Sequence, residues 1–306
     1  LLNSYAAGGC PVDCGPDWSK EHILAMLAHG PHKSAMATAA LKQLRHETTE
    51  KIAQGYARVV RWSEIKTNIP KKLKLSPVAM IPHKSKAYRC ILDLSFALVL
   101  NGVQLTSVNE QTRKLAMKKS MAQLGHVLKR LVHTMATHRD NNSPFLFAKL
   151  DVKDGFWRMA VNNNDAWNFC YVLPTLNKEV DVDNIEIVVP NSLQMGWCES
   201  PPFFCTGLET ARDLIERMCR EPLPPHEFEN IMVPPSDQKE VTRSSLPRAP
   251  ITSVEVYVDD FIGITNVGTR DHLISVSRAM LHGVHAIFPP PRVTGHQGPD
   301  PITEAK

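Results

Sequence analysis

The sequence predicts an α+β fold in which helices are mixed with short antiparallel β-hairpins. Three observations support this prediction. Short apolar runs occur in pairs around turn-forming residues, as in hairpins. Longer stretches carry apolar residues at helical spacing. Strands and helices do not alternate with the regular βαβ order of a doubly wound sheet. At 306 residues, the chain is long enough for one large domain or two closely associated ones.

The first half of the chain is expected to contain three helices and one hairpin. Residues 22–28 and 35–60 have loosely helical apolar spacing. Residues 75–94 form two apolar runs around the basic turn HKSKA, which is typical of a β-hairpin. Residues 117–135 are predicted to form an amphipathic helix. Its apolar stripe consists of Met117, Met121, Leu124, Leu128, Leu131 and Met135.

The second half is expected to contain most of the strands. The predicted elements are, in order, a strand ending at Asp151, a hairpin of residues 169–173 and 185–189, a helix over 202–218, two strands within 253–265 and a helix over 270–287. Residues 221–250 are rich in proline and polar side chains, which indicates a long surface insertion.

Composition and charge exclude several classes of protein. With 43% hydrophobic and 22% charged residues, the chain is too apolar to be disordered and too charged for a membrane protein. No apolar run is long enough to span a bilayer. Residues 1–140 have 21 Lys and Arg against 9 Asp and Glu, a net charge of +12, whereas residues 141–306 have 14 against 22, or −8. This division suggests a polyanion partner and bound cations, although ordinary solvated faces could also produce it.

The cysteines and the chain start bear on the cellular context. The seven cysteines, an odd number, lie mostly in apolar segments, as expected in a reducing compartment, either cytoplasm or nucleus. Cys10 and Cys14 are close in sequence, but no second Cys/His pair follows at the spacing of a zinc finger, so a zinc site is disfavoured. The start, Leu-Leu-Asn-Ser-Tyr, suggests a fragment of a longer product.

Adjacent carboxylates are the strongest chemical signal. Asp259 and Asp260 stand at the turn between two apolar strands, where they repel each other unless a divalent cation neutralises them. Asp151 ends another apolar strand, and Asp154 follows it closely. Together these acids could hold two Mg²⁺ ions about 3.5–4 Å apart, with Mn²⁺ as a substitute. In an isolated hairpin, Asp-Asp would more simply be a solvated turn.

Four sequence blocks resemble the reverse transcriptases of retroviruses and retrotransposons. YVDD at 257–260 is similar to motif C of that family, FAKLDVKDGFWRM at 147–159 to motif A, and LQMGWCESPPFFC at 193–205 to motif B. SPVAMIPHKSKAYRCILDLS at 76–95 resembles the fingers hairpin. The blocks follow the family order and cover about residues 75–290, whereas residues 1–70 match no part of the family.

The resemblance implies the fingers and palm of a right-hand polymerase, with an antiparallel palm sheet backed by helices. It also implies a division of the chain. The expected parts are an N-terminal helical segment (1–70), fingers (71–144), a palm with some fingers elements (145–290) and a tail (291–306) leading to an absent thumb. The thumb and ribonuclease H regions would belong to the parent polyprotein. The implied activity is template-directed DNA synthesis from dNTPs on an RNA or DNA template with a primer, with no membrane partner.

The resemblance also implies a role for each matching residue. Asp151 and Asp259 would be the main metal ligands, with Asp260 and the Val152 carbonyl beside them. The groups expected to bind the dNTP are Lys84, Lys86, Arg89, Asp154, Gly155, Phe156, Gln194, Met195 and Gly196. Among these, Arg89 and the lysines would hold the triphosphate, and Phe156 would exclude a ribose 2′-hydroxyl, although a core aromatic is its simpler interpretation. Trp197, Tyr257 and Val258 would contact primer or template.

The sequence departs from the family at two points. The family usually has Gln directly before the motif B glycine, where this chain has Met195, so the polar contact to the nucleotide would come from Gln194 or be missing. The general-acid lysine after motif C has only Lys306 as a weak candidate. The alternatives are a truncated, catalytically silent copy that only binds nucleic acid, and a phosphohydrolase or nuclease that uses the same acids.

Overall fold

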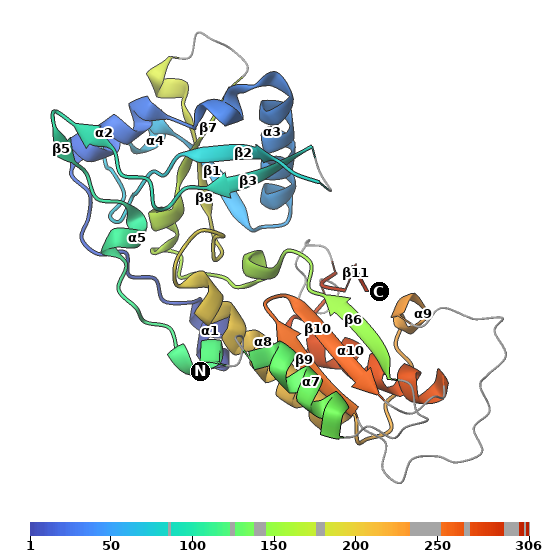
Figure 1. Cartoon of the computed structure of the whole chain (residues 1–306). Coiled ribbons are helices and arrows are strands. Elements are labelled where there is room, and N and C mark those ends of the chain that lie inside the picture. The colour runs from blue at the N-terminus through green and yellow to red at the C-terminus, as the bar shows by residue number, and fades with distance from the viewer. Residues whose placement is uncertain are drawn as a thin grey trace, which may run out of the picture. The chain divides into compact units, whose positions relative to one another are not determined.

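A computed structural model shows an α+β protein with small antiparallel sheets (Figure 1). It describes residues 1–84, 87–122, 126–137, 145–175, 181–232, 252–265, 270–290, 300–302 and 304–305. The chain divides into two compact units. Unit 1 consists of residues 1–116 and 156–200, and unit 2 of residues 117–155 and 201–306. Residues 1–70 belong to unit 1, and residues 145–290, the range expected to form the palm, are divided between the two units.

Within its described residues, unit 1 contains three small antiparallel sheets. The largest has the order β1 (Ala57–Arg61), β8 (Glu186–Pro190) and β7 (Tyr171–Leu173). The other two are the hairpins β2–β3 (Val78–Pro82 and Tyr88–Leu92) and β4–β5 (Val99–Leu100 and Val103–Gln104). The α-helices are α1 (Leu2–Gly8), α2 (Lys20–His29), α3 (Thr38–Ala53), α4 (Trp62–Ile65) and α5 (Val108–Gln111). Short 3-10 turns are η1 (Lys33–Met36), η4 (Ala166–Phe169) and η5 (Val182–Asn184).

Both hairpins predicted in unit 1 are confirmed. Met80 pairs with Cys90 in the β2–β3 hairpin, and Tyr171 pairs with Val188 between β7 and β8. The helix predicted over 35–60 is too long, because α3 ends at Ala53 and β1 begins at Ala57. Gly55 follows the helix with a positive φ of 74°. Glycine adopts this conformation without strain, and the conformation commonly ends a helix.

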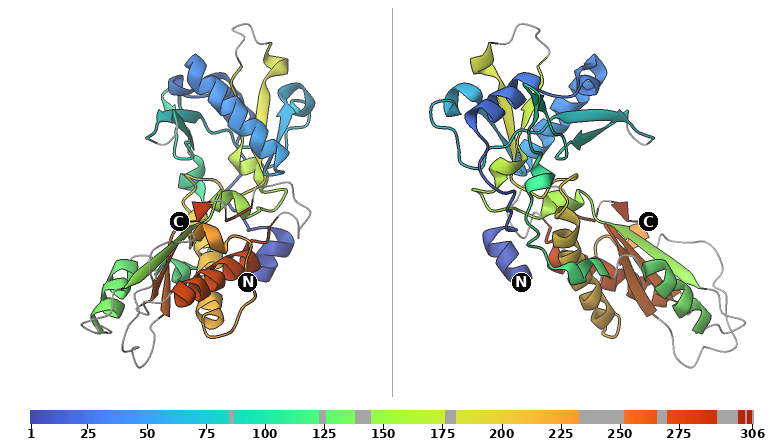
Figure 2. Two further views of the ribbon diagram at one scale, coloured as in Figure 1. Left: turned by 90° about the vertical axis from the view of Figure 1, so that its right-hand side faces the viewer. Right: turned by 60° about the vertical axis from the view of Figure 1, so that its left-hand side comes forward.

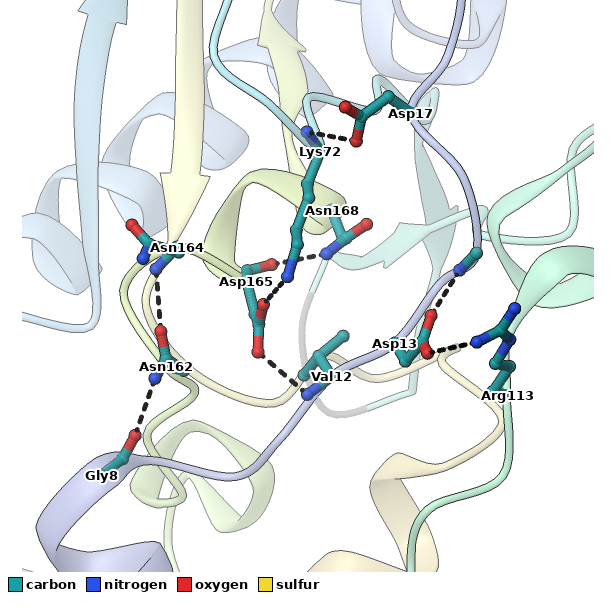
Figure 3. A network of polar contacts seen from close by, with 11 residues as sticks. Gly8, Val12, Asp13, Asp17, Lys72, Arg113, Asn162, Asn164, Asp165 and Asn168 are labelled. Carbon is teal, nitrogen blue, oxygen red and sulfur yellow. Dashed lines mark hydrogen bonds and ion pairs between the residues drawn. The ribbon is translucent and has the colours of Figure 1, made fainter.

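The N-terminal residues are an integral part of unit 1. Residues 9–18 run as an extended strap, in which Cys10 forms a parallel bridge with Val161 and Cys10, Val12 and Cys14 are buried. Val12 N–H donates to Asp165 Oδ2 (3.1 Å), and Asp165 Oδ1 pairs with Lys72 Nζ (2.5 Å; Figure 3). The strap therefore joins α1 to loops that lie far away in the sequence.

Unit 2 contains a four-stranded antiparallel sheet. Its strand order is β11 (Glu304–Ala305), β6 (Leu146–Asp151), β10 (Asp260–Thr265) and β9 (Thr252–Tyr257). Its helices are α6 (Lys118–Ala122), α7 (Val127–Thr137), α8 (Ser200–Met218), α9 (Glu229–Met232) and α10 (Arg270–Ile287). The 3-10 turn η3 (Gly155–Arg158) crosses from unit 2 into unit 1, and α8 begins at the opposite crossing.

Helices cover the two faces of this sheet unequally. On one face, Gly263 leaves room for α10, because an added Cβ would lie 2.7 Å from Met280 Sδ and 3.1 Å from Val276 Cγ1. On the other face, Ile264 packs against Val127 and Leu131 of α7. Figures 1 and 2 show α10 and α7 on opposite sides of the strands. On this second face, Phe147 and Lys149 of β6 are exposed.

The predicted helices of unit 2 are confirmed in part. α8 and α10 lie where the apolar spacing placed them, but the helix expected over 117–135 is split into α6 and α7. Leu128 is 75% exposed and Met117 46% exposed, so the predicted stripe is not one buried face. Leu131, which belongs to the predicted stripe, and Val127, which does not, pack against Ile264 of the sheet. Most of the proline-rich 221–250 range lies outside the described residues.

Among the described residues, no helix has both the length and the apolar character needed to cross a membrane.

Candidate functional site

The acidic turn lies in the hairpin of β9 and β10. Tyr257 and Asp260 are the last paired residues of the two strands, which leaves Val258 and Asp259 as the turn. Val258 has a positive φ of 55° and Asp259 does not, the pattern of a type II′ turn, which normally has glycine at its first central position. A β-branched residue is strained in this conformation, and such strain is often found at functional sites.

The strand register brings Asp151 to the same end of the sheet. Asp151 of β6 is paired with Asp260 of β10, so the two side chains project from one face with Cβ atoms about 4.5–5.5 Å apart. Val152 N–H donates to the Asp259 carbonyl at 2.9 Å. Asp151 thus meets Asp259 and Asp260, which lie more than 100 residues later in the sequence, at one end of one sheet. The Val152 carbonyl, the fourth expected ligand, accepts a hydrogen bond from Gly155 N–H at 3.3 Å.

Lys149 is a charged neighbour that the sequence analysis did not identify. It lies two residues before Asp151 on the same face of β6, and its Nζ is 2.8 Å from Asp260 Oδ1. The pKa of Lys149 is raised, mainly by its hydrogen bond to Asp260 and also by the charges of Asp260, Asp151 and Asp259. The ammonium group therefore supplies positive charge at the place where the carboxylates meet. The only signal for Lys149 in the sequence was its position two residues before Asp151, which places both side chains on the same face of a strand.

The acidic group is not a closed metal cage. Within the described ranges, no three His, Cys, Asp or Glu side chains form an arrangement that could hold a metal ion. Like-charged carboxylates separate when no cation lies between them, and Asp260 is already engaged by Lys149. The backbone places the acids together, and Lys149 is a protein cation that pairs with Asp260 at this place.

The loop after β6 packs directly against the acidic turn. Asp154 has a positive φ of 61°. A Cβ added to Gly155 would lie 3.2 Å from Phe204 Cζ of α8 and 3.9 Å from the Asp259 Cβ, so glycine permits this close approach. Phe156, which is expected to exclude a ribose 2′-hydroxyl, is half-buried and belongs to unit 1. Its expected role remains a prediction.

Two of the expected nucleotide-binding residues meet in unit 1. Arg89 of β3 is exposed, and its Nη2 donates to Met195 Sδ at 2.9 Å. α3 supports this strand, because the Gln43 amide accepts from Tyr88 N–H (3.1 Å) and donates to the Tyr88 carbonyl (2.6 Å). Lys84 is exposed near the hairpin tip. Lys86 lies outside the described residues, as does Lys306, the expected general acid.

Two other expected contacts face the interior. Gln194 is 3% exposed and its Nε2 donates to the Ser192 and Leu193 carbonyls, so its amide does not replace the polar group missing at Met195. Trp197 is 2% exposed, and its Nε1 donates to Thr112 Oγ1 at 3.0 Å. Trp197 therefore lies in the interior next to the Gly196 turn, and its buried ring is not presented to a primer or template. By contrast, Tyr257 is 53% exposed.

Asn109 holds the Gly196 turn and was also missed. Gly196 has a φ of 102°, and an added Cβ would lie 2.7 Å from the Leu92 carbonyl oxygen. Asn109 Nδ2 donates to the Gly196 carbonyl (2.8 Å), and Asn109 Oδ1 accepts from Cys198 N–H (3.0 Å). Asn109 lies in the four-residue helix α5, which is too short to give a periodic signal in sequence.

No protein-family model matches this sequence, and no curated protein is significantly similar to it.

Proposed function

We propose that this chain is the fingers and palm part of a reverse transcriptase, which synthesises DNA from dNTPs on a primed RNA or DNA template. In this proposal the sheet of unit 2, with α8 and α10, is the palm, and the β2–β3 hairpin of unit 1 belongs to the fingers. The Asp151–Asp260 register carries the proposal, because it joins two of the resembling blocks at their acidic residues.

The donor set at this sheet end fits divalent cations. Mg²⁺ prefers carboxylate and other hard oxygen ligands, and Asp151, Asp259 and Asp260 offer these at the ends of adjacent strands. When bound, two Mg²⁺ ions, or Mn²⁺ in their place, would favour ionisation of the attacking hydroxyl and neutralise charge on the leaving group. The protein would position these ligands, because the backbone hydrogen bond from Val152 N–H to the Asp259 carbonyl fixes the two loops against each other.

The reaction is nucleotidyl transfer. The primer 3′-hydroxyl attacks the α-phosphorus of the dNTP, a new P–O bond forms, the bond to the β,γ-phosphates breaks, and pyrophosphate leaves. The guanidinium of Arg89 would hold phosphate oxygens in a bidentate fork, and the exposed Lys84 would add a second positive charge. The chain would act mainly by positioning its substrates and by stabilising charge.

A primer-extension assay tests this proposal. The substrate is a poly(rA) template with an oligo(dT) primer, dTTP and Mg²⁺. Asp259→Asn removes the charge of one proposed ligand, and Asp271→Asn, an exposed acid of α10, is the matched control. We expect Asp259→Asn to lose about 100-fold or more in rate and Asp271→Asn to retain activity. Equal incorporation by all three proteins would remove Asp259 from the mechanism.

One observation favours a second function, a catalytically silent protein that only binds nucleic acid. Lys149 already pairs with Asp260, one of the proposed metal ligands, at 2.8 Å. This alternative predicts that primer–template is retained on a filter equally with Mg²⁺ and with EDTA, and that wild-type protein extends no primer. Extension that requires Mg²⁺ would exclude it.

A further inference from the structure

We propose that Asn109 is a positioning residue for nucleotide binding, because it locks the Gly196 turn against the strand that carries Arg89. This inference rests on the proposed function. The structure gives Asn109 a connection to both sides: its Nδ2 donates to Gly196 O and to Ser95 Oγ, both at 2.8 Å, and its own N–H donates to Leu94 O at 2.9 Å. Leu94 and Ser95 lie two and three residues after the end of β3.

The orientation of the Asn109 amide is fixed by its partners. The Gly196 carbonyl can only accept, and the Cys198 N–H, which lies 3.0 Å from Oδ1, can only donate. Both N–H groups and the carbonyl of the side chain are therefore used. No other common side chain places two donors and one acceptor at this spacing, so substitution removes at least one bond.

The backbone of Asn109 is itself held in place. α5 begins with a capping box, in which Ser107 Oγ accepts from Glu110 N–H (3.3 Å) and Glu110 Oε2 accepts from Ser107 N–H (2.8 Å). Val108 is 1% exposed and anchors the turn of helix in the interior. The side chain of Asn109 thus extends from a fixed base toward the loop that it holds.

The position of this turn matters because it presents Met195. Gly196 approaches the Leu92 carbonyl so closely that no Cβ fits, which places the turn against the end of β3. Arg89 lies on the same strand, and its guanidinium contacts Met195 Sδ at 2.9 Å. If the Asn109 bonds are lost, the turn is free to move away from β3, and the spacing between Met195 and Arg89 is no longer fixed.

Steady-state kinetics separate this role from general stabilisation. In the full chain, we expect Asn109→Ala and Asn109→Asp to raise the KM for dTTP about tenfold, with kcat changed less than about threefold. Asn109→Asp keeps the acceptor for Cys198 N–H but turns a carboxylate toward the Gly196 carbonyl. Asn162→Asp is the matched control, since Asn162 is an exposed asparagine of the same unit that bonds to Gly8 O (3.4 Å). An unchanged KM in active Asn109 variants would overturn the inference.

Amide hydrogen exchange tests, without relying on activity, whether the clamp formed by the hydrogen bonds of Asn109 to Gly196 and Cys198 holds this turn in place. We expect Asn109→Ala to speed exchange in a peptide covering residues 194–200, where the Cys198 N–H loses its acceptor. Asn162→Asp should leave that peptide unchanged. Unchanged exchange in Asn109→Ala would overturn the clamp. If wild-type protein did not extend primers but Asn109→Ala still exchanged faster, the proposed function would be wrong. The clamp formed by Asn109 would nevertheless be supported.

Discussion

Lys149 Nζ lies 2.8 Å from Asp260 Oδ1, at the point where two strands of the unit 2 sheet end in acidic residues. The pKa of Lys149 is raised by this hydrogen bond and by the charges of Asp260, Asp151 and Asp259. A lysine in this position partly neutralises the carboxylates while no divalent cation is bound. It would also compete with a cation for Asp260.

The first prediction concerns the substitution Lys149→Met. Without a divalent cation, Asp260 loses its ion-pair partner and Asp151 and Asp259 lose a nearby positive charge, so we expect the midpoint of thermal unfolding to fall by about 2–4 °C. Added Mg²⁺ should raise the midpoint of the variant more than that of the wild-type protein, because Asp260 is then free to bind it. Unfolding curves in EDTA and in Mg²⁺ measure both effects.

The control for this prediction is Lys118→Met, which removes an exposed positive charge from α6 of the same unit. It should respond to Mg²⁺ as the wild-type protein does. If Lys149→Met gained no more from Mg²⁺ than Lys118→Met, Lys149 would not be a competitor for the cation.

A chain of hydrogen bonds links two histidines of unit 2 to the residues before β11. Phe228 N–H donates to His226 Nδ1 (3.1 Å), His226 Nε2 lies 3.1 Å from His285 Nδ1, and His285 Nε2 lies 2.9 Å from Asp300 Oδ1. Since Phe228 N–H can only donate, His226 Nδ1 must accept, and a neutral His226 donates to His285. Protonation of His226 would place two donors against each other.

The second prediction is that unit 2 loses stability in weak acid. Burial, followed by the charges of His285 and His282, lowers the pKa of His226 from 6.5 to about 4, while Glu227 and Asp300 oppose this shift. Between pH 6.5 and about 4, His226 binds a proton in the unfolded chain but stays neutral in the folded protein. His226 should therefore lower the free energy of unfolding by up to about 3 kcal/mol between pH 6.5 and 4, and its contribution should not change further below pH 4.

Denaturant unfolding at several pH values measures this loss. His226→Asn keeps an acceptor for Phe228 N–H but does not titrate, so its stability should depend less on pH in this window. Burial also lowers the pKa of His22 and His272, so the difference between variant and wild type is the relevant quantity. The control is His46→Asn, an exposed histidine of α3. Identical pH profiles for all three proteins would contradict the assignment to His226.

The sequence predicted local elements better than long-range pairing. The hairpin of β9 and β10 was predictable because apolar residues alternate on both sides of one turn. That β6 pairs with β10, and in a register that sets Asp151 opposite Asp260, depends on packing across more than 100 residues. The sequence analysis grouped these acids because each lies at the end of an apolar strand, and the family resemblance assigned them to one metal site, but neither gave the register.

Side-chain orientation explains the remaining errors at the candidate site. Gln194 and Met195 are adjacent, so their side chains point in different directions, and the structure buries Gln194 and exposes Met195. Lys149 was missed because its contact with Asp260 exists only in the observed register. The interior position of Trp197 follows from its bond to Thr112, which no local pattern contains.

The third prediction concerns the N-terminal strap, residues 9–18. Asp165 is 12% exposed at its side chain, pairs with Lys72 and accepts the Val12 N–H (Figure 3). Asp165→Ala leaves both partners without an acceptor, so unit 1 should lose about 1–3 kcal/mol of stability. Limited proteolysis should then cut the strap faster. Asp165→Asn should lose less, because it keeps the acceptor for Val12.

The control for the strap is Asp183→Ala. Asp183 pairs with Lys66 at 2.6 Å, but its side chain is 46% exposed, and such surface pairs contribute at most about 1 kcal/mol. Proteolysis of the strap should be unchanged in this variant. Equal effects of Asp165→Ala and Asp183→Ala would show that the strap is not held by Asp165.

The last prediction separates stability from activity at the acidic turn. Val258 adopts a φ of 55° at a turn position that favours glycine. Val258→Gly relieves the strain of the left-handed conformation, which outweighs the greater entropy of glycine in the unfolded chain, so stability should rise by about 1 kcal/mol. Primer extension should fall, because a freer turn holds Asp259 less firmly. Val103→Gly, at an exposed position of β5, should reduce stability and leave extension unchanged. A Val258→Gly variant that is less stable than wild type would show that the turn is not strained.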